Sequence, residues 1–180
     1  MIYIALLRGI NVGGHNKIKM ADLKKMLETI GLKNVKTYIQ SGNVLFESEE
    51  IAADLTRKIE EAIQKEFGFP VTVVLRTAPE LEQIIKKCPY SLDDLFEGES
   101  VHVAFLAGIP TDEGINYLQN FNKGNDEYHI EGQDVYLYFR QSIRDSKLAA
   151  QLPKLGVQAT VRNWKTVKNL DSMVKEMEKA

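Results

Sequence analysis

Apolar and polar positions along the first half of the chain predict a βαββαβ order of elements. Residues 1–7 are apolar without alternation, which is typical of a strand that is covered on both faces. Strands are predicted from alternation or short apolar runs at 35–39, 44–46 and 71–75, and amphipathic helices from apolar spacing at 20–30 and 51–67. This order of elements is that of a ferredoxin-like unit.

A similar order returns in the second half of the chain. Thr77 and Glu80 form a capping-box pattern that opens a further helix, and an acidic, polar segment follows it. The elements predicted after that segment are a strand at 101–107, a helix at 111–121, a hairpin of 128–130 and 135–139, a helix at 142–152, a short strand at 159–161 and an amphipathic terminal helix at 167–178.

We therefore predict an α+β protein with two ferredoxin-like βαββαβ subdomains and a C-terminal helix, a domain duplication visible in the order of elements. The predicted domain organisation is a first subdomain with an added helix at 1–90, a connector at 91–100, and a second subdomain with the C-terminal helix at 101–180.

Topology brings two polar loops of the first subdomain to one end of its sheet. The first two strands run in the same direction, so the loop at 8–17 and the hairpin turn at 40–43 share that end, together with the loop at Gly68. Arg8 and Lys17 supply positive charge, and nearby glycines let backbone N–H groups converge beside a helix N-terminus, an arrangement that suits an oxyanion. The predicted ligand-binding residues here are Arg8, Asn11, Gly13, Gly14, Lys17, Gln40, Ser41 and Asn43.

Each of these segments also has a purely structural interpretation. Glycine and asparagine serve tight turns for backbone reasons alone, and we favour that interpretation for the turn at 41–43. For the longer loop at 8–17 the two interpretations are balanced. The glycine spacing of that loop resembles a phosphate-binding P-loop, but His15 and Asn16 stand where lysine and a hydroxyl residue are required, so we exclude a P-loop nucleotidase.

A second polar cluster precedes the terminal helix. Arg162, Asn163 and Lys165 adjoin Trp164, the only tryptophan, and are predicted to contact an anion beside its aromatic ring, while Thr166 can cap the helix. The structural alternative, which we favour here, is that Trp164 anchors the helix and Arg162 pairs with an acidic neighbour.

Composition and charge limit the remaining functions. With 44% apolar and 27% charged residues the chain has ordinary globular composition, and a formal charge of -2 argues against coating nucleic acid by charge alone. Cys88 is the only cysteine, which excludes an intramolecular disulfide, and neither a leader peptide nor an apolar run of membrane-spanning length is visible, so we expect a cytoplasmic protein. The three histidines are widely separated, and we predict no metal site, cofactor or catalytic residue.

Three motifs resemble one bacterial family. The runs Ala-Leu-Leu-Arg-Gly-Ile-Asn-Val-Gly-Gly at 5–14, Thr-Tyr-Ile-Gln-Ser-Gly-Asn at 37–43 and Thr-Val-Arg-Asn-Trp at 160–164 closely resemble the domain of unknown function 1697. The resemblance spans nearly the whole chain and implies two ferredoxin-like subdomains in a cytosolic protein, without an established activity. Lys165 departs from the family pattern, in which asparagine is common at that position.

The leading functional hypothesis is binding of a small phosphate- or carboxylate-bearing ligand at the 8–17 loop and the 40–43 turn. A second hypothesis is single-stranded nucleic-acid binding through stacking on Tyr38, Tyr136 and Tyr138, which the acidic balance disfavours. A third is a protein–protein interaction module that uses an open sheet face or edge. We expect no membrane partner, and the sequence leaves the oligomeric state and any enzymatic activity open.

Overall fold

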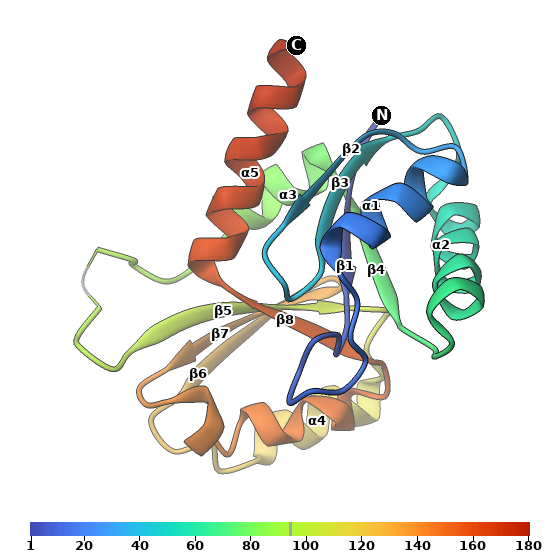
Figure 1. Ribbon diagram of the computed structural model, residues 1–180. Coiled ribbons are helices and arrows are strands. Elements are labelled where there is room, and N and C mark those ends of the chain that lie inside the picture. The colour runs from blue at the N-terminus through green and yellow to red at the C-terminus, as the bar shows by residue number, and fades with distance from the viewer. Residues whose placement is uncertain (94) are drawn as a thin grey trace. The chain divides into compact units, whose positions relative to one another are not determined.

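The computed structural model describes residues 1–93 and 95–180 and divides into two compact units (Figure 1). One unit comprises Met1–Gln83 together with Leu170–Ala180, and the other is Ile84–Asn169. This division by compactness differs from the predicted boundaries at 1–90, 91–100 and 101–180, which remain a prediction. Asp94, in the predicted connector, lies outside the described residues.

The first unit has the βαββαβ order that the apolar pattern predicts. Its elements are β1 (Ile2–Leu7), α1 (Met20–Thr29), β2 (Lys33–Tyr38), β3 (Asn43–Glu47), α2 (Ala52–Phe67) and β4 (Val73–Thr77). The strands lie in the order β2-β3-β1-β4, and every neighbouring pair is antiparallel. Since β1 and β2 both run antiparallel to β3, they run in the same direction, as predicted.

The core of this unit lies between the sheet and its two helices. Leu23 and Leu27 of α1 and Ile59 of α2 are buried against inward residues of the central strands, among them Ala5 and Phe46. Burial of these side chains is the main favourable term that holds α1 and α2 on this face of the sheet (Figure 1).

The second unit repeats the arrangement with one difference. Its elements are β5 (Ser100–Leu106), α4 (Asp112–Asn120), β6 (Glu127–Glu131), β7 (Asp134–Phe139), the 3₁₀ helices η1 (Ile143–Asp145) and η2 (Ala149–Leu155), and β8 (Ala159–Asn163). The strand order β6-β7-β5-β8 matches that of the first sheet. The duplicated ferredoxin-like α+β fold is thus confirmed.

The predicted α-helix at 142–152 is wrong, because the segment forms the two short 3₁₀ helices. Two serine side chains accept hydrogen bonds from the local backbone, Ser142 from Arg144 N–H at 3.3 Å and Ser146 from Ala149 N–H at 3.2 Å. Such bonds compete with the α-helical ladder, and Pro153 has no N–H to donate to it.

The last strand of each sheet leads directly into a helix: α3 (Ala78–Lys86) follows β4, and α5 (Trp164–Lys179) follows β8. The capping box of α3 is confirmed, since Thr77 N–H donates to Glu80 Oε1 at 2.8 Å and Glu80 N–H donates to Thr77 Oγ1 at 3.3 Å. At α5 the cap is Asn163, whose Oδ1 accepts from Thr166 N–H at 2.9 Å, so the predicted capping role of Thr166 is wrong.

A residue-level repeat accompanies these two junctions. Arg76 and Arg162 occupy the same position, one residue before the strand ends, and both are buried. In each case Nη1 donates to the carbonyl of the preceding residue, at 2.8 Å for Arg76 and 3.1 Å for Arg162. The duplication therefore extends from the order of elements to individual side chains.

The end of α5 packs as its apolar spacing predicts. Leu170, Val174 and Met177 are buried, and Leu170–Ala180 belongs to the first compact unit. Among the described residues, no helix combines the length and apolar character needed to cross a membrane.

Candidate functional site

The loop after β1 and the turn after β2 meet at one end of the first sheet. Leu7 N–H donates to Gly42 O at 2.9 Å, and Asn11 Nδ2 donates to Gln40 O at 2.8 Å. The segment before β4 joins them, because Arg8 N–H donates to Thr72 O at 3.0 Å. The predicted convergence of segments distant in sequence is therefore confirmed.

Asn11 holds the base of the loop closed. Its Oδ1 accepts from Ile18 N–H at 2.8 Å, and its Nδ2 donates to Ile18 O at 3.0 Å as well as to Gln40 O. The backbone of Asn11 has φ +55°, a left-handed conformation that asparagine tolerates better than most residues. The polar atoms that made Asn11 a predicted ligand contact are thus engaged by the protein backbone.

The turn between β2 and β3 is stabilised by residues whose roles are structural. Gly42 has φ +91°, and a Cβ there would lie 2.7 Å from Ile10 Cδ1 and 2.9 Å from Leu7 Cβ, so only glycine fits. Asn43 is fully buried, and its Nδ2 donates to Tyr38 O and to Ser41 Oγ, both at 3.0 Å. These contacts agree with the structural interpretation of this turn, in which glycine and asparagine are needed for the backbone conformation.

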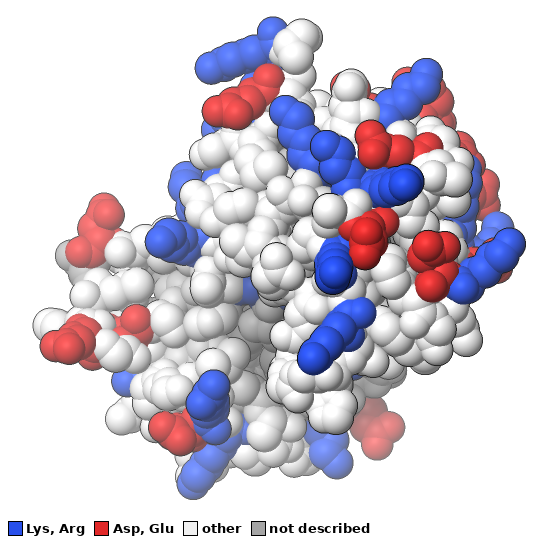
Figure 2. Space-filling view, viewed as in Figure 1, with Lys and Arg blue, Asp and Glu red and all other residues white. Residues whose placement is uncertain are grey.

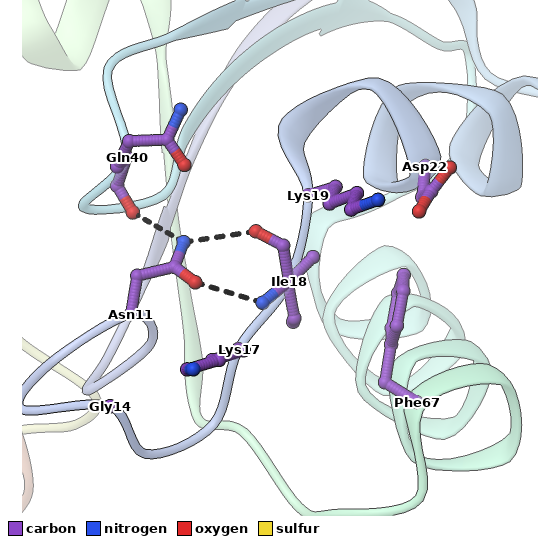
Figure 3. Close-up of a pocket in the computed structure, with 8 residues that line it drawn as sticks. All are labelled: Asn11, Gly14, Lys17, Ile18, Lys19, Asp22, Gln40 and Phe67. Atoms are coloured by element: carbon purple, nitrogen blue, oxygen red, sulfur yellow. Dashed lines mark hydrogen bonds between the residues drawn. The ribbon is translucent and has the colours of Figure 1, made fainter.

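A hollow of about 590 Å³ opens beside the loop and the turn (Figure 3). The residues that line it are Asn11, Gly14, Lys17, Ile18, Lys19, Asp22, Gln40 and Phe67. Four of them were predicted as ligand-binding residues. The other four, at positions 18, 19, 22 and 67, were missed, although 18–22 lead into the predicted first helix and Phe67 adjoins Gly68, which topology places at this end.

Charge in the hollow is mixed, with positive charge in excess. Lys17 and Lys19 contribute two ammonium groups and Asp22 one carboxylate. Lys19 is also the N-cap residue of α1 and makes no side-chain capping hydrogen bond, so the positive end of the helix dipole adds to the attraction for an anion.

The two ends of the hollow differ in character. Figure 3 shows Lys17 and Gly14 on one side and Asp22 and Phe67 on the other, with Ile18 between them. Gly14 has φ +80°, and a Cβ there would lie 4.0 Å from Lys17 Cε, so the lysine stem passes close to the glycine backbone. Apolar atoms form more of the lining than polar atoms do.

The remaining predicted site residues lie outside this lining. Arg8 and Gly13 are exposed on the same loop, and Ser41 and Asn43 belong to the turn. In the second unit, burial lowers the pKa of Arg162 to about 10, and Asn163 caps α5. The ligand contacts predicted for these residues remain predictions.

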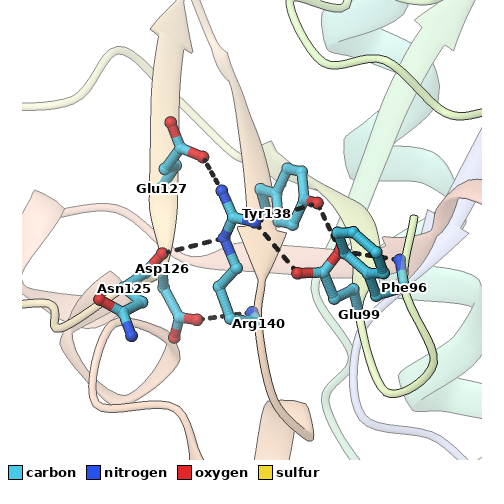
Figure 4. A network of polar contacts seen from close by, with 7 residues as sticks. All are labelled: Phe96, Glu99, Asn125, Asp126, Glu127, Tyr138 and Arg140. Atoms are coloured by element: carbon cyan, nitrogen blue, oxygen red, sulfur yellow. Dashed lines mark hydrogen bonds and ion pairs between the residues drawn. The ribbon is translucent and has the colours of Figure 1, made fainter. Parts of the chain in front are cut away.

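Two of the tyrosines proposed to stack nucleic-acid bases are enclosed in the second unit. Tyr136 is fully buried, and its hydroxyl donates to Ile84 O. Tyr138 is nearly buried, with its hydroxyl donating to Glu99 Oε1 at 2.7 Å and the Arg140 guanidinium 4.4 Å from its ring centroid (Figure 4). Neither ring offers a free face to a base, which corrects that part of the nucleic-acid hypothesis.

The network around Tyr138 has a structural role. Arg140 donates to Glu99 Oε2 at 3.0 Å and to Glu127 Oε2 at 2.9 Å, and Glu99 also accepts from Phe96 N–H (Figure 4). The Phe96 N–H and the Tyr138 hydroxyl, followed by Arg140, hold the pKa of Glu99 below its ordinary value. These contacts attach the segment that precedes β5 to the end of β7.

Surface charge gives no extended basic patch on the face seen in Figure 2, where acidic and basic side chains are interspersed. A search of the described residues for three or more histidine, cysteine, aspartate or glutamate side chains placed to hold a metal ion finds none.

A family model described as "Protein of unknown function (DUF1697)" matches residues 1–136, which is most of the chain. The chain belongs to the DUF1697 family. No curated protein matches it. Among solved structures, the DUF1697 protein is similar to one described as conserved bacterial protein SP0830 from Streptococcus pneumoniae, with 25% identity and a TM-score of 0.81. The match covers 96% of this chain and 97% of that chain, so the likeness extends over both units.

Proposed function

We propose that this DUF1697 protein binds a small molecule carrying a phosphate or carboxylate group, in the hollow where the loop after β1 meets the turn after β2. The observation that carries the proposal is that Lys17 and Lys19 both line one hollow, beside which the Asn11 hydrogen bonds join the loop to Ile18 and to the turn. Two cations beside an apolar wall are suited to a small organic anion rather than to a bare surface ion.

The dimensions and rigidity of the hollow support the same function. Pockets for small molecules commonly have volumes of roughly 300–1,000 Å³ and mostly apolar linings with a few polar groups, and a hollow of about 590 Å³ falls within that range. Because Asn11 joins the loop to both Ile18 and Gln40, the ligand would meet a loop that is already ordered. Binding then avoids much of the entropy cost of ordering a flexible segment.

Thermal shift with inorganic phosphate, ribose 5-phosphate, a mixture of nucleoside monophosphates and citrate tests the proposal. A ligand at 100 times its dissociation constant stabilises the folded protein by roughly 2.7 kcal/mol, which is a measurable rise in melting temperature. We expect at least one anion to give a saturable rise that decreases as salt is added.

Variants then locate the effect. Lys17→Gln and Lys19→Gln should each reduce the ligand-induced rise. The matched control is Lys33→Gln, because Lys33 is an exposed lysine of the same unit at the opposite end of β2, away from the hollow. If no anion in the panel stabilises the wild-type protein, or if Lys33→Gln has the same effect as Lys17→Gln, the proposal is wrong.

A further inference from the structure

The arrangement of side chains in the hollow restricts where a negative group can sit. Asp22 lies at the Phe67 end, and Figure 3 shows the Lys19 side chain directed toward it, so the carboxylate offsets the positive charge of Lys19 there. Phe67 is also the last residue of α2, so the negative end of that helix dipole opposes the positive end of the α1 dipole at Lys19. A bound anion is therefore directed to the opposite end, beside Lys17 and the exposed backbone of Gly14.

The Phe67 end favours a flat, apolar group with hydrogen-bond donors at its edge. Phe67 is half-buried against the core, which fixes its ring while leaving part of it in the lining of the hollow. Aromatic rings stack on such a surface, and the bases of nucleotides do so regardless of sequence. Asp22 accepts hydrogen bonds and cannot donate them when ionised, so it is matched by an amino or hydroxyl group on the ligand.

We infer, building on the proposed function, that the ligand class is a single nucleoside monophosphate. The phosphate lies beside Lys17 and Gly14, the base lies against Phe67, and Asp22 accepts from a base or ribose donor. Two lysines against one aspartate leave an excess of one positive charge, which suits a monophosphate better than a triphosphate. A hollow of about 590 Å³ whose lining includes one half-buried phenylalanine also suits one nucleotide better than a strand.

Isothermal titration calorimetry of the full chain separates the two parts of the ligand. The probes are the four ribonucleoside 5′-monophosphates, the corresponding nucleosides, ribose 5-phosphate and inorganic phosphate. We expect at least one nucleoside monophosphate to bind tenfold or more tightly than ribose 5-phosphate, because only the former reaches Phe67.

Two variants assign each part to its residue. Phe67→Leu should remove that tenfold preference while leaving ribose 5-phosphate binding within twofold of wild type, which also shows that the variant is folded. Lys17→Gln should weaken nucleotide and ribose 5-phosphate together and leave nucleoside binding unchanged. The control is Phe96→Leu, since Phe96 has a strongly exposed side chain in the other unit and should change neither affinity.

The outcomes distinguish the two proposals. If ribose 5-phosphate binds at the Lys17 site and no nucleotide binds more tightly, the nucleotide inference is wrong and anion binding stands. If nucleosides bind through Phe67 and neither phosphate nor Lys17 contributes, the proposed anion function is wrong. If none of the probes binds, the nucleotide inference is refuted, and the proposed function is refuted with it when citrate also gives no thermal stabilisation.

Discussion

Replacing Gly42 by alanine should destabilise the first unit far more than an ordinary loop substitution. The new Cβ would meet Ile10 Cδ1 at 2.7 Å and Leu7 Cβ at 2.9 Å, distances that force one side chain or the backbone to move. Ile10 and Leu7 are both buried, so neither can move without disturbing the core.

The expected magnitude has two parts. A left-handed backbone at φ +91° costs an alanine roughly 1–2 kcal/mol. Overpacking against buried atoms adds roughly 1–3 kcal/mol. The free energy of unfolding should therefore fall by roughly 2–5 kcal/mol.

Gly31→Ala is the matched control. Gly31 has φ +99° in the same unit, but a Cβ there meets nothing within 4 Å, so only the backbone part applies. Equilibrium urea unfolding followed by circular dichroism measures both variants, with the slope against urea checked for constancy. The excess of Gly42→Ala over Gly31→Ala then isolates the steric contact.

A double mutant tests which atom causes the excess. Ile10→Val removes the Cδ1 atom that lies closest to the new Cβ, so Gly42→Ala should cost less in that background than in wild type. Equal losses for Gly42→Ala and Gly31→Ala, or no coupling between positions 42 and 10, would refute the reasoning that close packing selects glycine here.

Two further predictions concern polar groups. Asn11→Gly keeps the left-handed backbone but removes three hydrogen bonds, so the free energy of unfolding should fall by roughly 2–4 kcal/mol. Asn11→Ala should lose roughly 1 kcal/mol more, because alanine is strained at the positive φ of this position. Equal losses for the two variants in urea unfolding would contradict the contribution of φ. Folding lowers the pKa of the Glu99 carboxyl, chiefly through the hydrogen bond from Phe96 N–H. The ionised carboxylate therefore stabilises the folded protein above its ordinary pKa of 4.5, and this stabilisation is lost as the pH falls through the lower pKa of the folded state. Glu99→Gln should therefore be destabilising at pH 7 and converge with wild type in acid, whereas the exposed neighbour Glu97→Gln should follow wild type throughout.

The periodicity of apolar residues was sufficient to predict most elements, because burial on one face of a helix or strand leaves a regular trace in the sequence. It also predicted that the loop after β1 and the turn after β2 would meet, since that follows from strand direction alone. It was insufficient at 142–152, where side-chain bonds from Ser142 and Ser146 and the missing N–H of Pro153 favoured 3₁₀ turns over the apolar spacing.

The candidate site was predicted as a location and only partly as a set of residues. Residue type suggested Asn11 and Asn43 as ligand contacts, but hydrogen bonds to backbone atoms engage the amide groups of both. Such local partners depend on loop geometry, which periodicity does not encode. Phe67 was counted as one more member of an apolar helix stripe, because sequence spacing does not show that a helix's last residue borders an opening.

The hydrogen bonds of Asn11 have a consequence for how this loop tolerates change. By joining residue 11 to residue 18 across the base of the loop, one side chain separates the intervening tip from the packed body below it. Insertions, deletions and exchanges in the tip can then alter Gly14, Lys17 and their neighbours while the sheet and its register stay unchanged. The side-chain amide of Asn11 thus allows the residues of the tip, and with them the ligand specificity, to change while the rest of the unit keeps its structure.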